Sequence, residues 1–161
     1  MKREGRLDGP DSAQLWTYVG ATLFLVALLG SAIDVPGLRI LHSFQALIYI
    51  AVIVLARQNS PWGYGAGFAI AIVWNGNELV AHVMQADAVA LWSSLRAGHV
   101  PQIVPMMVML GGAAHLILIA AALFAFTRHN TKAGRWWKFA GGGVLSIAYF
   151  ALIVVIAQPH F

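Results

Sequence analysis

The chain of 161 residues contains no cysteine, and this absence excludes disulfides, thiolate metal sites and thiol catalysis. Charged side chains are also scarce, at 10% of the residues, whereas a soluble domain has about 25%. The HEXXH, histidine-box and phosphate-loop motifs are missing, so no short motif indicates a metal, haem or nucleotide site. Enzyme classes that depend on these features are therefore not indicated.

Hydrophobic residues are abundant, at 60% of the chain. A water-soluble domain of this size has too much surface to bury them, whereas a bilayer covers about 20 apolar residues per helical span. We therefore predict an all-α, polytopic membrane bundle of five transmembrane helices. The expected spans are residues 15–33, 38–56, 62–84, 102–126 and 137–157. Residues 1–14 are expected to form a cytoplasmic tail, and residues 15–161 a single transmembrane domain.

Two segments have further interpretations. The first apolar run resembles a cleaved signal peptide in having Gly30, Ser31 and Ala32 near its end, but it is long enough to span the membrane. Residues 86–97 are less apolar, and Trp92 and Leu95 belong to a set that repeats at helical spacing. That pattern predicts a short interfacial helix on the outer side.

The lysines and arginines indicate the orientation of the chain. With five spans and a cytoplasmic N-terminus, eight of them lie inside and two, Arg39 and Arg96, lie outside. If the third segment is instead a re-entrant loop, four spans remain and the distribution becomes five against five. The positive-inside rule favours five spans, with the C-terminus on the outer side. Orientation also explains the basic residues without a nucleic-acid partner, and we take a bacterial inner membrane as the expected location.

The third predicted span contains an unusual polar face. Its members are separated by three or four residues and so form one stripe along a helix: Gly63, Gly67, Ala71, Asn75, Glu78 and His82. Small residues in the inner half allow close helix contact. A carboxylate within a span costs free energy and is normally turned toward protein or water. Glu78 therefore indicates that the outer half of this face contacts protein or water.

Polar residues of two other spans match this face. His42, Gln45 and Tyr49 lie three and four residues apart in the second span. Gln45 is expected at the depth of Glu78, and His42 at the depth of His82. His115 follows a glycine pair in the fourth span and could meet Tyr49 or Asn75. These residues predict a ligand site in the outer half of the bundle: His42, Gln45, Tyr49, Asn75, Glu78, His82 and His115.

We expect this site to bind a small ligand, a metal ion or a proton, with transport as one use. For a metal, His42, Glu78 and His82 supply two imidazoles and a carboxylate, and histidines on different spans could also hold haem. The alternative is that these residues only join the helices. Other hypotheses are an accessory subunit of a larger membrane complex or homo-oligomer, and a haem or metal enzyme. We favour binding over catalysis and assign no catalytic residue.

Overall fold

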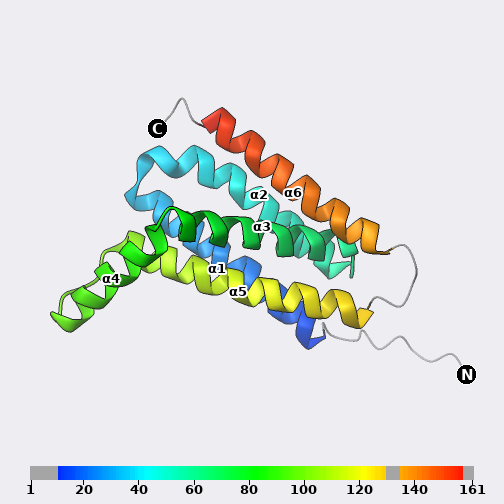
Figure 1. Cartoon of the computed structure of the whole chain (residues 1–161), viewed down its shortest axis with the longest axis horizontal. Helices are drawn as coiled ribbons and strands as arrows, with labels where there is room; N and C mark the ends of the chain where they lie inside the picture. Colours follow the sequence, from blue (N-terminus) through cyan, green and yellow to red (C-terminus); the bar gives the residue numbers. More distant parts are fainter. Residues whose placement is uncertain (1–10, 130–134, 158–161) are drawn as a thin grey trace, which may run out of the picture.

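The computed structural model describes residues 11–129 and 135–157, and these ranges are almost entirely helical (Figure 1). No strand occurs within them, which confirms the all-α prediction. The elements are α1 (Ser12–Asp34), a 3-10 turn η1 (Pro36–Leu38), α2 (Arg39–Arg57), α3 (Pro61–Val80), α4 (Val83–Arg96), α5 (Ile103–His129) and α6 (Arg135–Ala157).

Local sequence explains several helix starts. The Asp11 side chain caps α1 by accepting a hydrogen bond of 2.8 Å from the Gln14 backbone N–H, which would otherwise lack a partner. Pro36 and Pro61 stand in the first turn of η1 and α3, where the missing proline N–H costs no helical hydrogen bond.

Four helical segments are long and apolar enough to cross a membrane: Ser12–Asp34, Pro36–Arg57, Ile103–Arg128 and Arg135–Ala157. Large apolar side chains such as Leu29, Leu145 and Val155 are exposed on the outside of the bundle, where a bilayer would cover them. The chain is therefore an integral membrane protein. With 20 residues, α3 has the length of a span, but glycines, two asparagines and Glu78 lower its hydropathy. The structure thus supports four of the five predicted spans.

Along the chain, the helices other than α4 alternate in direction, and α3 lies in the middle of the bundle (Figure 1). It packs against α2, α5 and α6, while α1 packs mainly against α5 and α2. One end of the bundle, called the α4 end below, holds the last turns of α1 and α3 and the first turns of α2 and α5. From this end α4 projects beyond the other helices.

Glycines permit a very close approach of α3 and α6. A Cβ atom added at Gly65 would overlap the backbone carbonyl of Phe139, and one added at Gly142 would overlap the carbonyl of Trp62. Glycines of the predicted small-residue stripe also allow close contact with other helices. Gly63 lies against the backbone of α2 at Leu55, and Gly67 against side chains of α2 and α5.

Several predicted boundaries need correction. The third span was expected to reach Met84, but α3 ends at Val80 and α4 begins at Val83. Between them His82 has a left-handed backbone with φ of 57°, so the polar stripe does not continue through this residue. The segment predicted as an interfacial helix is helical. Residues 12–14, assigned to the N-terminal tail, belong to α1, and the rest of that tail up to residue 10 lies outside the described residues.

Candidate functional site

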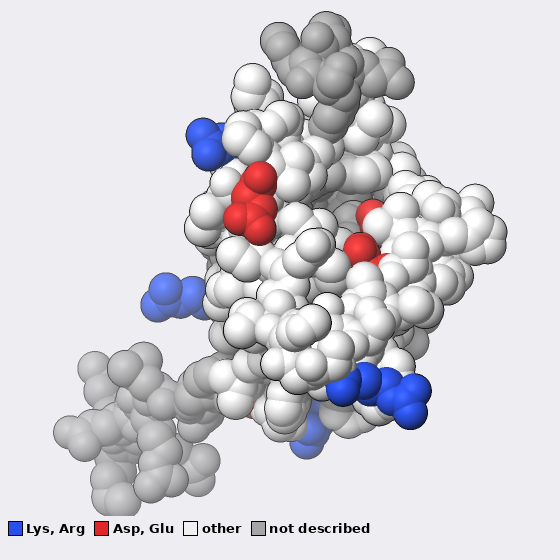
Figure 2. Space-filling model, turned by 90° about the vertical axis from the view of Figure 1, so that its left-hand side faces the viewer, with Lys and Arg blue, Asp and Glu red and all other residues white. Residues whose placement is uncertain are grey.

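A cavity of about 210 Å³ lies at the α4 end, among residues of α1, α2, α3, α4 and α5. Figure 2 looks onto this end and shows acidic side chains inside a hollow. The walls are mainly apolar and include Phe24, Trp74 and Met107. Their polar members are Ser31, His42, Glu78 and Asp87. The cavity thus brings together two of the predicted site residues, His42 from α2 and Glu78 from α3.

Hydrogen bonds fix the orientation of His42. Its Nδ1 lies 3.0 Å from the backbone oxygen of Leu28 and 3.1 Å from Oγ of Ser31. A carbonyl oxygen can only accept, so Nδ1 donates, and Nε2 of the neutral ring is left as an acceptor. The α2 side of the cavity therefore offers a lone pair as well as an apolar surface.

Two carboxylates approach the cavity from different helices. Glu78 is half-buried, and its Oε2 atom is buried without a hydrogen-bond partner among the described residues. Asp87, in α4, also lines the cavity, and burial raises the pKa of this carboxyl above its usual value. None of the described residues that line the cavity is a lysine or an arginine. The cavity therefore has acidic groups without a basic side chain to neutralise them.

Tyr49 and His115 form a pair deeper in the bundle. Oη of Tyr49 lies 2.7 Å from Nε2 of His115, and the two residues are 1% and 0% exposed. The His115 ring stacks on Phe24 at 3.7 Å between ring centroids and meets the edge of Trp74 at 4.8 Å. Its Nδ1 is buried without a partner among the described residues. Of the two contacts predicted for His115, the one with Tyr49 is present.

The two predicted amides, Gln45 and Asn75, do not line the cavity. Gln45 is one helical turn from both His42 and Tyr49 on α2, and Asn75 is one turn from Glu78 on α3. Both amides are buried. Gln45 Oε1 and Asn75 Oδ1 are each buried without a hydrogen-bond partner in the described part of the chain. Buried polar atoms normally have partners, so these oxygens are unusual.

His82 stands apart from the other predicted site residues. It occupies the turn between α3 and α4, is exposed and does not line the cavity. The expected i, i+4 pairing with Glu78 on one helix face is wrong because the helix ends before His82. Within the described residues, no three histidine, aspartate or glutamate side chains are close enough to hold a metal ion. The residues present therefore do not fit the predicted metal site of His42, Glu78 and His82, and none of them is assigned as a haem ligand.

Sequence reasoning missed several members of the site. Asp87 was treated as part of a surface helix, although its acidic side chain within an otherwise apolar segment was a usable signal. Phe24 and Trp74 contact both the cavity and His115. Trp74 was recognisable as the only tryptophan deep within a span, but Phe24 has no feature that distinguishes it from other apolar residues of α1.

A second group of polar side chains lies at the opposite end of the bundle. Gln14 Nε2 donates to the Ala56 backbone oxygen at 2.7 Å, and Tyr64 Oη donates to Asn59 Oδ1 at 2.8 Å. These bonds join α1 and α3 to the C-terminal end of α2. Because each of these groups is paired within the chain, they support the packing of the helices.

Comparison with protein-family models, with curated proteins and with solved structures found no match to this chain. Functional inference therefore depends on the residues and their arrangement.

Proposed function

We propose that the protein crosses a bacterial inner membrane five times, with α3 as the third crossing and the N-terminus in the cytoplasm. Length supports this proposal, because the 20 residues of α3 extend about 30 Å as a helix. Its position supports it too, since α3 packs against three apolar helices that can shield its polar groups. The positive-inside rule then places the α4 end on the outer side.

The position of α4 in this topology is at the outer membrane surface. None of its fourteen described residues is buried in the bundle, and Val89, Trp92 and Leu95 are all exposed. The Arg96 guanidinium lies 5.6 Å from the Trp92 ring centroid. An exposed apolar set with a tryptophan and a nearby arginine suits the boundary between lipid and water.

Single cysteines test the topology cleanly because the chain has no cysteine of its own. His99→Cys probes the turn after α4 and Gln58→Cys the turn before α3, and both native residues are exposed. An impermeant thiol reagent added to intact bacterial cells should label position 99 but not 58. Protection of both positions, with labelling restored after lysis, would support the re-entrant alternative and overturn the five-span proposal.

We propose that the cavity at the α4 end binds a small ligand, cation or proton, and that the protein uses this site for transport or sensing. The observation that carries the proposal is Glu78, which lines a cavity with a second carboxylate and whose Oε2 atom is buried without a hydrogen-bond partner among the described residues. An unpaired polar group of this kind is costly within a membrane helix. A ligand or a proton would supply the missing partner.

Ligand-dependent thermal stabilisation of the purified protein tests the site. Metal ions, small organic cations and pH are varied for the wild type and for Glu78→Gln, which removes the charge but keeps the shape. Asp34→Asn is the matched control, because Asp34 is exposed near the same end and does not line the cavity. The expected result is a response that Glu78→Gln loses and Asp34→Asn keeps. A folded Glu78→Gln variant that retains every response would refute the proposal.

A second candidate function, an accessory subunit of a larger membrane complex, is favoured by α4. Its exposed apolar side chains would then pack against a partner protein instead of the membrane surface. Copurification from native membranes at endogenous abundance distinguishes these roles. A stable, stoichiometric partner that is lost when Trp92 and Leu95 are replaced by serine would support the accessory role, whereas a chain that purifies alone would contradict it.

A further inference from the structure

The polar groups that line the cavity are mainly hydrogen-bond acceptors, namely the carboxylates of Glu78 and Asp87 and the Nε2 atom of His42. Glu78 Oε2, Asn75 Oδ1 and Gln45 Oε1 are all buried and lack partners within the described chain. Glu78 lines the cavity, and the two amides lie one helical turn deeper on α3 and α2. An acceptor buried without a donor costs about 1–3 kcal/mol. A ligand that pairs with the acceptors of the cavity wall must bring N–H or O–H donors.

The charge of the cavity walls indicates that the ligand is a cation. Glu78 and Asp87 are the acidic wall residues, and His42 is held as a hydrogen-bond donor at Nδ1 by the Leu28 carbonyl. The arginines near this end are engaged elsewhere. Arg39 donates to the Ala32 backbone oxygen at 3.1 Å, and Arg96 lies over Trp92. A positively charged ligand would neutralise the carboxylates that the protein itself leaves uncompensated.

The shape and chemistry of the cavity favour an organic cation over a metal ion. A metal site needs three or four ligands at fixed distances, and no such group of three exists among the described residues. The volume of about 210 Å³ is far larger than a single ion requires. Its walls are instead mainly apolar, and the Phe24 and Trp74 rings can contact an apolar body or the face of a cation.

We propose that the cavity recognises an organic cation that carries N–H donors, such as a primary ammonium or a guanidinium, attached to a small apolar body. This inference rests on the proposed ligand-binding function. The cationic group is directed toward the carboxylates of Glu78 and Asp87, and the apolar body contacts Phe24 and Trp74. A quaternary ammonium has the same charge but no N–H group, so it cannot donate a hydrogen bond to either carboxylate.

The experiment compares phenethylammonium with its N,N,N-trimethyl derivative, measuring the affinity of each for the purified full chain in detergent. The neutral phenylethanol and Zn²⁺ complete the series. The primary ammonium should bind more tightly than the trimethyl derivative, and phenylethanol and Zn²⁺ should bind weakly or not at all.

Comparison of the ligands in the wild type decides the inference without any substitution in the cavity wall. Equal affinity for the primary and trimethyl ammonium ions, or tight binding of Zn²⁺ alone, would overturn the N–H requirement but leave the proposed ligand site standing. If no cation binds and no response depends on Glu78, the proposed function fails together with the inference. Asp34→Asn should bind phenethylammonium as the wild type does, and loss of binding in that control would also count against the cavity.

Discussion

Replacing Gly65 with alanine should destabilise the bundle by separating α3 from α6. The new Cβ atom would overlap the Phe139 carbonyl oxygen, and a backbone atom cannot rotate away as a side chain can. Overpacking costs about 1–3 kcal/mol, and this rigid contact should fall at the upper end of that range. Alanine gains about 1 kcal/mol over glycine in a helix, so the net loss should be about 2 kcal/mol.

Gly76→Ala is the matched control, because it makes the same chemical change in the same helix. No described atom outside the local helix lies within 4 Å of a Cβ atom at Gly76, so only the gain in helix propensity remains. Thermal unfolding followed by tryptophan fluorescence measures both variants. At about 2–4 °C per kcal/mol, Gly65→Ala should unfold about 4–8 °C below the wild type. Gly76→Ala should unfold at the same temperature or higher. Equal stability of the two variants would refute the close α3–α6 contact.

Further variants test the Tyr49–His115 pair and the half-buried Asp87 carboxyl. Tyr49→Phe removes the partner of His115 Nε2 and should cost about 1–3 kcal/mol of unfolding free energy, while the double variant with His115→Leu should cost less than the sum of the single changes. Additive losses in this double-mutant cycle would contradict the pairing. Burial raises the pKa of Asp87, so the folded state retains a proton that the unfolded chain releases, and stability falls as pH rises through that interval. Asp87→Asn should therefore raise the unfolding temperature at neutral pH and lose this advantage in acid, and an unchanged pH dependence of unfolding would contradict it.

Much of the fold could be predicted from hydropathy because α1, α2, α5 and α6 are continuous apolar segments bounded by charged or turn-forming residues. Pro36 and Pro61 mark helix starts that the structure contains. Part of the polar site could be predicted from the sequence for a related reason. His42, Tyr49, Glu78 and His115 stand out within apolar segments, and helical spacing places them on faces that can meet.

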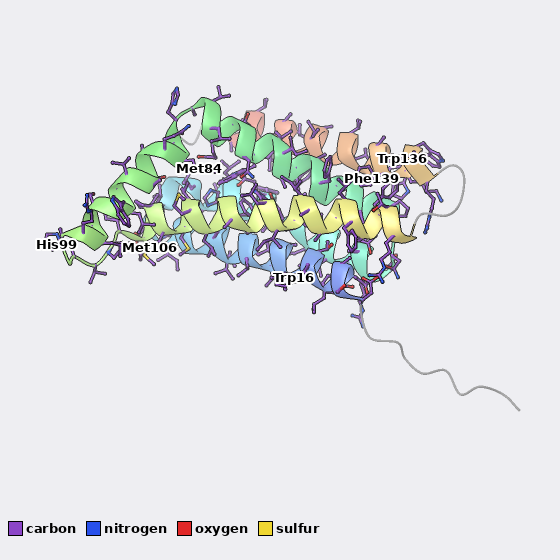
Figure 3. All side chains as sticks on the ribbon, turned by 60° about the horizontal axis from the view of Figure 1, so that its bottom comes forward. Trp16, Met84, His99, Met106, Trp136 and Phe139 are labelled. Atoms are coloured by element: carbon purple, nitrogen blue, oxygen red, sulfur yellow. The ribbon has the colours of Figure 1, made fainter. Side chains whose placement is uncertain are left out.

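The break before α4 could not be predicted in this way. The chain has neither glycine nor proline between Glu78 and Met84. His82 nevertheless adopts a left-handed backbone conformation, which is uncommon for residues other than glycine. A contact distant in sequence accompanies the break. The methyl group of Met84 lies over Gly112 of α5, 2.8 Å from the position of an added Cβ atom, and Figure 3 shows Met84 at the junction of these helices. Tertiary packing of this kind overrides local helical preference.

The polar character of α3 is best understood from its central position. A helix with two asparagines and a glutamate would be unstable if lipid surrounded it, but α2, α5 and α6 cover much of its length. Its glycines allow that cover, because they bring α6 and α2 against its backbone near one end. Toward the other end polar residues, including Asn75 and Glu78, replace most of the glycines, and there α4 diverges and the cavity appears. The polar residues that make α3 the least apolar of the five proposed crossings therefore also supply Glu78 to the proposed ligand site.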